Sequence, residues 1–464
     1  MSTLHVFAIG GTGSRVLRSL TMLLSSGVKC EMDIRPVIID PDHSNEDVSR
    51  TSILLQNYCQ LRKKLSFDTS AKNAFFKTFL QKDGDLRMPL ENTNDKRFRD
   101  YIGLSNLPIE SQALMRGLYS DNDLDATMRV GFEGHPNRGS MVLNQMSKTD
   151  AFKQFANTFK QGDRIIIVSS IFGGTGASGF PLLLKMLREN KDMQNHSLIN
   201  NANIGAVSVL PYFKVKQDDN SPIDSATFIS KTRSALQYYK RTISDQKKLQ
   251  CLYYIGEQKG KSYDNHKGGQ EQCNDAHFVE LSSALAIVDF ANNDYEGQNI
   301  HKEFGINDMK QDQHEIIFEN LGEETQKLIR VPLIQMSLLY KLFYNHYDKM
   351  SEQTYVLNRG KNFLDEEWVR KFKSFLGDYH SWLKELAGND MSFNPFEFNP
   401  GSTKDPLDIV KGTKCKRGLL SKKGFDHFDN VIGKQSTNAG NNIQQFVDNL
   451  YAATKQMAEN DYIG

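Results

Sequence analysis

The chain has 464 residues, which is too long for one ordinary hydrophobic core and predicts two or three domains at roughly 150 residues each. Its 57 lysine and arginine residues balance 56 aspartate and glutamate residues, so the formal net charge is +1 and no long-range field favours nucleic acid or acidic lipid. The five cysteines lie far apart without a Cys-x-x-Cys pair, which excludes a disulfide framework and a zinc ribbon.

The N-terminus and the hydropathy pattern predict a cytoplasmic protein. The chain enters an expected strand within a few residues, without the charged and apolar segments of a leader, and contains no apolar run of about 18 residues. We therefore expect no nucleic-acid partner and no membrane insertion.

The first expected strand, residues 4–9, leads into a helix expected at 15–25 whose apolar residues share one face. Between them lies a glycine-rich loop formed by Gly10, Gly11, Thr12, Gly13 and Ser14. This loop is similar to a dinucleotide fingerprint, but Val16 occupies the third glycine position, so the match is incomplete.

A second expected strand, residues 35–39, ends at Asp40 and Asp42. Ligands of parallel sheets collect at the carboxyl ends of the strands, so either acid could hold a ribose hydroxyl or a magnesium-bound water. Capping of the next helix by these short acids is an equally good interpretation. Residues 45–128 are polar and irregular, and we interpret them as surface elaboration with one helix at about 71–80.

A further glycine-containing loop covers residues 131–140 and includes Gly134 and Arg138. Arginine beside glycine backbone could face a terminal phosphate. The alternative is a surface turn with a solvated arginine.

The densest glycine run follows a β-branched strand expected at 165–172 and precedes a helix expected at 180–188. Free N–H groups at such a helix start point to one place, which suits a phosphate. Thr175 and Ser178 add hydroxyl donors, and the alternative is a turn that only packs. The run consists of Gly173, Gly174, Thr175, Gly176, Ala177, Ser178 and Gly179.

Strands expected at 204–211 and 252–255 alternate with a helix at 228–239, which predicts a parallel sheet covered on both faces. The most apolar helix is expected at 274–291, buried, with Asn274 as its N-cap. No metal site is predicted there, because His266, Cys273 and His277 have no fourth ligand at a zinc-like spacing. Amphipathic helices are expected at 328–344, 366–387 and 442–457.

Glycine loops on three strands of one sheet, followed by a buried helix, resemble the tubulin/FtsZ superfamily. The run from Gly173 to Gly179 matches the superfamily signature, and the chain looks like a divergent bacterial tubulin-like protein. The resemblance implies an α/β fold: a Rossmann-like parallel-sheet GTPase domain at 1–300, including the core helix 274–291. A mainly α or α+β C-terminal domain would follow at 301–464, with a polar loop region at 389–436.

The resemblance implies GTP or GDP as ligand, with Mg²⁺, and a guanine contact from Asn274, whose amide is both donor and acceptor. In polymerising members, a loop after the core helix enters the next subunit's site and orients the attacking water. Here Asp294 and Glu296 have the right residue types without a clear family spacing. The resulting hypothesis is a GTP-binding protein that self-assembles into a filament or oligomer and hydrolyses GTP at subunit interfaces.

Two alternatives remain open at this point. A scaffold would bind the nucleotide without turnover and recruit a protein partner through the C-terminal domain; some relatives occur in bacterial systems proposed to act against phage. A dinucleotide-dependent oxidoreductase is permitted by residues 10–13 but leaves residues 173–179 unexplained.

Overall fold

A computed structural model describes residues 2–42, 44–68, 72–81, 87–88, 90, 93, 96–128, 131–132, 135–215, 225–257, 262–263, 273–303, 314–399, 404–413, 424–435 and 442–463. Its centre is a six-stranded sheet in the order β2-β1-β3-β4-β6-β8, in which every pair of neighbours is parallel. The expected α/β class is confirmed. The strands are β1 (Thr3–Ile9), β2 (Asp33–Ile39), β3 (Arg164–Ser170), β4 (Asn203–Val209), β6 (Cys251–Ile255) and β8 (Ile300–Glu303).

The position of β2 at the edge of the sheet follows from its proline. Pro36 has no N–H group, so a second ladder of hydrogen bonds on its far side would be broken there. Irregular chain covers this edge instead: Ile34 N donates to Phe79 O at 2.9 Å, and Met88 N donates to Ile38 O at 2.8 Å.

The register brings the carboxyl ends of the strands to one edge of the sheet. Ile9 lies opposite both Ile39 and Ser169, and Ser169 lies opposite Ser208. The segments that follow β1, β2 and β3 therefore leave the sheet side by side, as ligand-binding segments of parallel sheets do.

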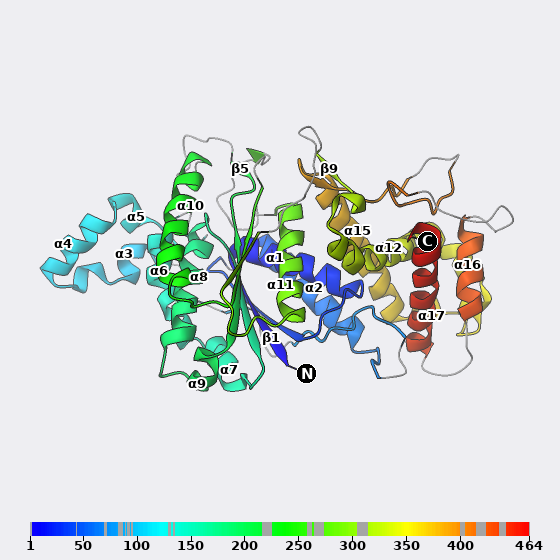
Figure 1. The fold of residues 1–464 in the computed structure, drawn as a ribbon, viewed down its shortest axis with the longest axis horizontal. Coiled ribbons are helices and arrows are strands. Elements are labelled where there is room, and N and C mark those ends of the chain that lie inside the picture. The colour runs from blue at the N-terminus through cyan, green and yellow to red at the C-terminus, as the bar shows by residue number, and fades with distance from the viewer. Residues whose placement is uncertain are drawn as a thin grey trace.

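Helices cover both faces of the sheet (Figure 1). One face carries α1 (Gly10–Ser25), α2 (Glu46–Arg62) and α11 (Phe278–Asn292), and the other carries α6 (Pro136–Leu143), α8 (Gly174–Glu189) and α10 (Ser225–Tyr239). Short helices complete this half: α7 (Asp150–Thr158), α9 (His196–Asn200) and, projecting away from the body, α3 (Phe98–Tyr101), α4 (Ile109–Leu118) and α5 (Asp121–Asp125).

The buried core helix is confirmed, but its expected start at Asn274 is wrong. Helix α11 begins at Phe278 because His277 is its N-cap: His277 Nδ1 accepts from Val279 N at 3.1 Å, and Glu280 Oε2 accepts from His277 N at 3.0 Å. This reciprocal pair satisfies two donors at the helix start. Asn274 lies in the extended segment before the helix.

The C-terminal region is mainly helical and packs beside α1, α2 and α11 (Figure 1). Strand β8 extends the sheet beyond residue 300, and α16 falls inside 389–436, where only polar loop was expected. The helices are α12 (Glu323–Asn345), α13 (Tyr347–Met350), α14 (Thr354–Leu357), α15 (Glu367–Ala387), α16 (Gly424–Gln435) and α17 (Asn442–Met457). Two small parallel pairs join β5 (Lys214–Val215) to β7 (Ser262–Tyr263) and β9 (Glu315–Ile316) to β10 (Ser392–Phe393).

The interpretation of residues 45–128 is partly wrong. The described residues 72–80 contain no helix, and Leu80 instead bridges to Ile34 of the sheet. Helix α2 was not predicted, although Asn45 caps it by accepting from Asp47 N at 3.0 Å. Within the described part of the chain, no helix combines the length and hydrophobicity that crossing a bilayer requires.

Close packing of β4 on α11 depends on Gly205. A Cβ atom at this position would lie 2.8 Å from the ring of Phe290, which is fully buried. We predict that Gly205→Ala lowers the free energy of unfolding by about 1–3 kcal/mol in urea denaturation, because the ring cannot withdraw from a filled core.

The matched control is Gly117→Ala on α4. Among the described residues, no heavy atom outside the helix backbone and the neighbouring residues lies within 4 Å of the place that a Cβ atom would take at Gly117. This change should instead stabilise the chain by about 0.5–1 kcal/mol, because alanine loses less backbone freedom than glycine on folding. Equal effects of the two changes would contradict the role given to Gly205.

Candidate functional site

The glycine loops expected at 10–14 and 173–179 form the first turns of helices. Helix α1 begins at Gly10 and α8 begins at Gly174, with Gly173 as the N-cap of α8. The expected loops at 10–14 and 173–179 are therefore largely helical. The positive φ of Gly10, 74°, still requires glycine at the turn out of β1.

Segments from three parts of the chain converge on Thr175. A Cβ atom at Gly10 would lie 3.6 Å from Thr175 Cβ, and one at Gly131, whose φ is 86°, would lie 3.8 Å from Thr175 Oγ1. The first turns of α1 and α8 are thus brought together with unpaired N–H groups and positive dipole ends. Gly134 lies outside the described residues.

Other glycines of these runs allow the helices to lie close to the sheet. A Cβ atom would lie 2.7 Å from Ala8 C at Gly13, 2.5 Å from Ser170 O at Gly176, and 2.8 Å from Ile9 Cγ2 at Gly179. Packing is therefore the observed role of these glycines. Ser178 Oγ donates to Gly174 O at 2.6 Å, so this expected donor turns back into its own helix.

Several residues at the starts of α1 and α8 are partly exposed and therefore accessible to a ligand. Gly11, Gly173, Thr175 and Ala177 are half-buried, whereas Thr12 and Ser14 are buried. Ser14 Oγ makes no hydrogen bond within the described part of the chain.

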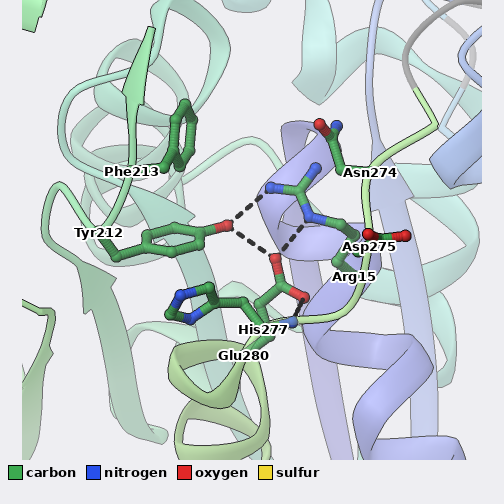
Figure 2. A pocket seen from close by; sticks show the side chains of 7 residues that line it. All are labelled: Arg15, Tyr212, Phe213, Asn274, Asp275, His277 and Glu280. Carbon is green, nitrogen blue, oxygen red and sulfur yellow. Dashed lines mark hydrogen bonds and ion pairs between the residues drawn. The ribbon is translucent and has the colours of Figure 1, made fainter. Parts of the chain in front are cut away.

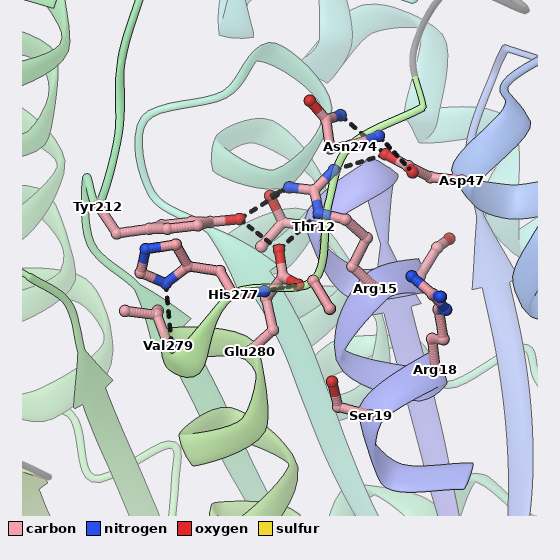
Figure 3. Close-up of polar contacts among 12 residues, drawn as sticks. Thr12, Arg15, Arg18, Ser19, Asp47, Tyr212, Asn274, His277, Val279 and Glu280 are labelled. Carbon is pink, nitrogen blue, oxygen red and sulfur yellow. Dashed lines mark hydrogen bonds and ion pairs between the residues drawn. The ribbon is translucent and has the colours of Figure 1, made fainter. Parts of the chain in front are cut away.

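A buried arginine on α1 joins the elements around this edge (Figure 3). Arg15 Nε donates to Glu280 Oε1 at 2.5 Å and Nη1 donates to Asp47 Oδ2 at 2.7 Å. Its Nη2 donates to the hydroxyl of Tyr212 at 2.7 Å. Burial opposes the charge, but Tyr212, Glu280 and Asp47 together raise the pKa of Arg15 well above its ordinary value.

The hydroxyl of Tyr212 donates in turn to Glu280 Oε1 at 2.7 Å. Glu280 is buried in the first turn of α11, and both oxygens of its carboxylate accept hydrogen bonds: Oε1 from Arg15 and Tyr212, and Oε2 from the backbone of His277. The Nε2 atom of His277 lies 3.1 Å from Glu257 Oε2. Because His277 Nδ1 is an acceptor, Nε2 carries the ring proton and faces this carboxylate.

A pocket opens beside these groups, between α1, the segment after β4 and the start of α11 (Figure 2). Asn274 stands at its rim, with its backbone N donating to Asp47 Oδ1 at 3.0 Å and its Nδ2 donating to Asp47 Oδ2 at 2.9 Å. The pocket is lined by Arg15, Tyr212, Phe213, Asn274, Asp275, His277 and Glu280.

Asp40 and Asp42 form a local network after β2. Asp40 Oδ1 accepts from Asp42 N at 2.9 Å, and Asp42 Oδ1 accepts from Ser44 N at 3.0 Å. Neither acid caps α2, since Asn45 does. Burial raises the pKa of Asp40 to about 7. Among the described residues, no group of three or more His, Cys, Asp or Glu side chains could hold a metal ion.

Arg138 is buried in α6, so its interpretation as a solvated surface arginine is wrong. Its Nη2 donates to Phe132 O at 3.0 Å, and its Nε lies 3.7 Å from Asp123 Oδ1. These contacts hold the segment after Gly131 against α6. Its contact with a phosphate stays a prediction.

Asp294 and Glu296 lie at the opposite edge of the sheet. Helix α11 ends beside the start of β3, where Arg164 Nη1 donates to Phe290 O at 3.1 Å and to Asn293 O at 2.6 Å. A seven-residue strand separates this edge from the glycine segments, a distance of about 20 Å. Within one chain these acids do not reach the pocket.

Several residues of the pocket were not predicted from the sequence. Arg15 and Glu280 are charged residues at the starts of helices whose other residues are largely buried, and a charge at such a position is the signal that could have identified them. Asp47 could not be identified as a partner of Arg15, because the helix that carries it, α2, was not predicted. Tyr212 follows an expected strand end without any motif around it.

No protein-family model matches the sequence, and no curated protein matches it. Solved structures of CetZ proteins, which belong to the tubulin/FtsZ family that the glycine run resembles, are similar to the chain at low identity. CetZ2 from Haloferax volcanii, in a protofilament with GTPγS bound, is 12% identical with a TM-score of 0.29, and the match covers 63% of this chain and 58% of that chain. CetZ from Methanosaeta thermophila is 14% identical with a TM-score of 0.29, covering 63% and 52%. CetZ1 from Haloferax volcanii, a GDP-bound monomer, is 13% identical with a TM-score of 0.30, covering 62% and 58%.

The chain thus matches little more than half the length of these neighbours.

The raised pKa of the Asp40 carboxyl should make stability depend on pH. Its pKa is about 7 in the folded chain against 3.8 for an ordinary aspartate, so the folded state retains a proton that the unfolded state has lost. The stability from this difference is fully present below the unfolded pKa and is lost as pH rises through about 7, with an upper limit of about 4 kcal/mol. We predict that Asp40→Asn matches the wild type only below about pH 4, is already somewhat more stable near pH 5, and exceeds the wild type by a larger margin near pH 8 in urea denaturation.

The matched control is Asp192→Asn, the same change at an exposed loop position. It should leave the pH profile of the wild type unchanged. A constant stability difference between Asp40→Asn and the wild type across this pH range would contradict the assignment.

Proposed function

We propose that the chain binds a guanine nucleotide at the carboxyl edge of the sheet and assembles head to tail, with GTP hydrolysed at the contact between subunits. The observation that carries the proposal is the convergence of Gly10, Gly131 and Thr175 beside a pocket that contains Arg15 and Glu280. The space framed by Gly10, Gly131 and Thr175, which we call the glycine cradle, suits phosphates. The adjoining charged pocket suits a base.

The phosphate side fits the residues present. The positive φ of Gly10 favours glycine at the turn between β1 and α1, and its missing side chain leaves the backbone beside Thr175 uncovered. Unpaired backbone N–H groups of two helix starts supply fixed donors, and an anion there gains from both dipoles. In this proposal Gly11, Thr12, Gly173 and Thr175 bind and orient the phosphates.

The base side favours guanine over adenine. The guanidinium of Arg15 is only a donor, whereas the carboxylate of Glu280 is only an acceptor. Guanine offers the acceptors O6 and N7 together with N–H donors, and arginine is the usual partner of those acceptors. Entry of a base would exchange the present contact between Arg15 and Glu280 for contacts with the base, while Asp47 continues to hold Arg15 and Asn274.

Asp40 and Asp42 are the residues of this edge that fit a magnesium ion accompanying the phosphates. Carboxylate oxygens are the ligands that Mg²⁺ prefers, and a nearby cation would favour the ionised form of Asp40. When bound, the ion would neutralise phosphate charge.

Head-to-tail assembly follows from the separation of the two halves of the catalytic site. The glycine cradle lies at one edge of the sheet, and Asp294 lies at the other, with its side chain 68% exposed. A contact between unlike ends repeats without closing when no rotation brings it into a ring, and it then forms a filament. In such an assembly Asp294 and Glu296 of one subunit face the cradle of the next and orient the water.

Thr175 provides a test of the phosphate cradle. Glutamate in the first turn of α8 is favourable for the helix dipole, so Thr175→Glu should fold. Its charge should repel phosphates a few ångströms away, and we predict at least a tenfold loss of GTP affinity, or about 1.4 kcal/mol. Titration of a fluorescent GTP analogue measures this loss.

The matched control is Thr354→Glu, an exposed position in the first turn of α14, far along the chain in the C-terminal region. Its GTP affinity should equal that of the wild type. An unchanged affinity of Thr175→Glu would exclude the cradle as the phosphate site.

Shared catalysis predicts that two inactive variants complement each other. Asp294→Ala combined with Glu296→Ala should keep nucleotide affinity and lose turnover, while Thr175→Glu loses turnover because it binds poorly. An equimolar mixture should recover about a quarter of the wild-type turnover, because that fraction of head-to-tail contacts pairs an intact cradle with intact acids. Phosphate release, recorded with light scattering across a range of protein concentration, is the measurement.

Wild-type turnover should rise steeply with protein concentration together with scattering. Turnover proportional to protein at all concentrations, or no recovery in the mixture, would contradict the shared site. GTP binding without turnover at any concentration would favour the nucleotide-gated scaffold.

A further inference from the structure

The carboxylate of Glu385 on α15 lies next to the chain segment that lines the pocket. It accepts hydrogen bonds from α1, from α2 and from the backbone before α11. Arg18 Nη1 donates to its Oε2 at 2.5 Å and Arg18 Nη2 donates to its Oε1 at 2.9 Å. Arg50 Nη2 donates to Oε1 at 2.5 Å, and the backbone N of Ala276 donates to Oε2 at 2.8 Å. Burial raises the pKa of Glu385, but the hydrogen bonds and charges of Arg18 and Arg50 hold it below its ordinary value.

The partners of Glu385 continue the polar layer that lines the pocket. Arg18 lies one helical turn beyond Arg15 on α1, and Arg50 lies one turn beyond Asp47 on α2. The inner pair, Arg15 with Asp47, contacts the pocket side, while the outer pair converges on Glu385. One carboxylate therefore bridges the two arginines that flank the inner pair.

The backbone N–H and the backbone C=O of Ala276 are both held by residues of α15 and its end. Glu385 accepts from Ala276 N, and Asn389 Nδ2 donates to Ala276 O at 2.6 Å. Arg50 also donates to Asn274 O at 3.3 Å. The residues on either side of Ala276, Asp275 and His277, line the pocket.

We propose that Glu385 is a positioning residue of the nucleotide site, through which the C-terminal region sets the base-side wall formed by residues 274–277. It does not touch the nucleotide itself. The inference rests on the proposed function and extends it, since the site is then incomplete without α15.

Loss of the Glu385 carboxylate should disturb the conformation of residues 274–277 without detaching α15 from α1 and α2. Trp382 is fully buried, and its Nε1 donates to Ser19 Oγ at 3.2 Å, while Trp368 Nε1 donates to Leu61 O at 2.9 Å. These contacts anchor α15 on α1 and α2 independently of Glu385. Without the carboxylate, Arg18 and Arg50 repel each other, and the Ala276 N–H group loses its acceptor.

The test compares GTP with inorganic tripolyphosphate, which has no base, by calorimetric titration of the full chain. Glu385→Ala should weaken GTP binding at least tenfold, or about 1.4 kcal/mol, and change tripolyphosphate affinity by less than about twofold, because the glycine cradle is unaltered. Glu385→Gln keeps an oxygen for Ala276 N and should give an intermediate loss. Hydrogen exchange at residues 273–277 should accelerate in Glu385→Ala.

The matched control is Glu367→Ala on the same helix, where the carboxylate is exposed and pairs only with Lys371 at 3.3 Å among the described residues. It should leave GTP and tripolyphosphate affinities unchanged. If Glu385→Ala does not fold, the milder Glu385→Gln carries the same comparison.

The outcomes separate this inference from the proposed function. A wild type that binds GTP, with folded Glu385 variants that bind GTP equally well or lose GTP and tripolyphosphate affinity in parallel, would overturn the positioning role alone. A wild type that binds neither ligand would overturn the proposed function and this inference with it.

Discussion

Arg15 carries a buried positive charge that water cannot stabilise, so the surrounding chain has to supply its partners. Those partners come from α2, α11 and the segment after β4, and each must be in place for the charge to be compensated. Removing one partner from such a network is costly, because the remaining charge stays buried. The polar wall of the pocket therefore holds together as one unit, and a ligand that enters must offer hydrogen bonds in exchange.

The parallel sheet determines what one subunit can do alone. The register of its strands places the glycine segments at the carboxyl edge. Helix α11 runs back along the sheet, so Asp294, which follows it, lies at the amino edge beside the start of β3. A cradle at one end and acids at the other cannot meet within a chain. If these acids serve the cradle, the chemistry requires a second copy, and assembly becomes a condition of catalysis.

Local patterns in the sequence predicted the sheet, the buried core helix and the positions of the glycine segments, because strand periodicity and glycine clusters are short-range signals. They did not predict where α11 begins, because the N-cap role of His277 rests on its contacts with Val279 and Glu280, whereas Asn274 is bound to Asp47 of another helix. They also did not separate a packing glycine such as Gly13 from Gly10, whose positive φ sets it apart. The contact between Arg18 and Glu385 joins residues 367 positions apart, and no local pattern reports it.

The contact between Arg18 and Glu385 crosses the boundary near residue 300 that was predicted between a nucleotide-binding domain and a C-terminal domain. The C-terminal region binds both the backbone N–H and the backbone C=O of Ala276, immediately beside residues that line the pocket. A bound base that shifts residues 274–277 must therefore shift α15 or break those bonds. If a bound base displaces α15, linkage requires the reverse as well. A second ligand that displaces α15 then changes the affinity for the base by the same factor by which the base changes the affinity for that ligand. If the pocket binds a nucleotide, a change in the contacts around the Glu385 carboxylate is enough to connect it with the C-terminal helices, and no domain has to move.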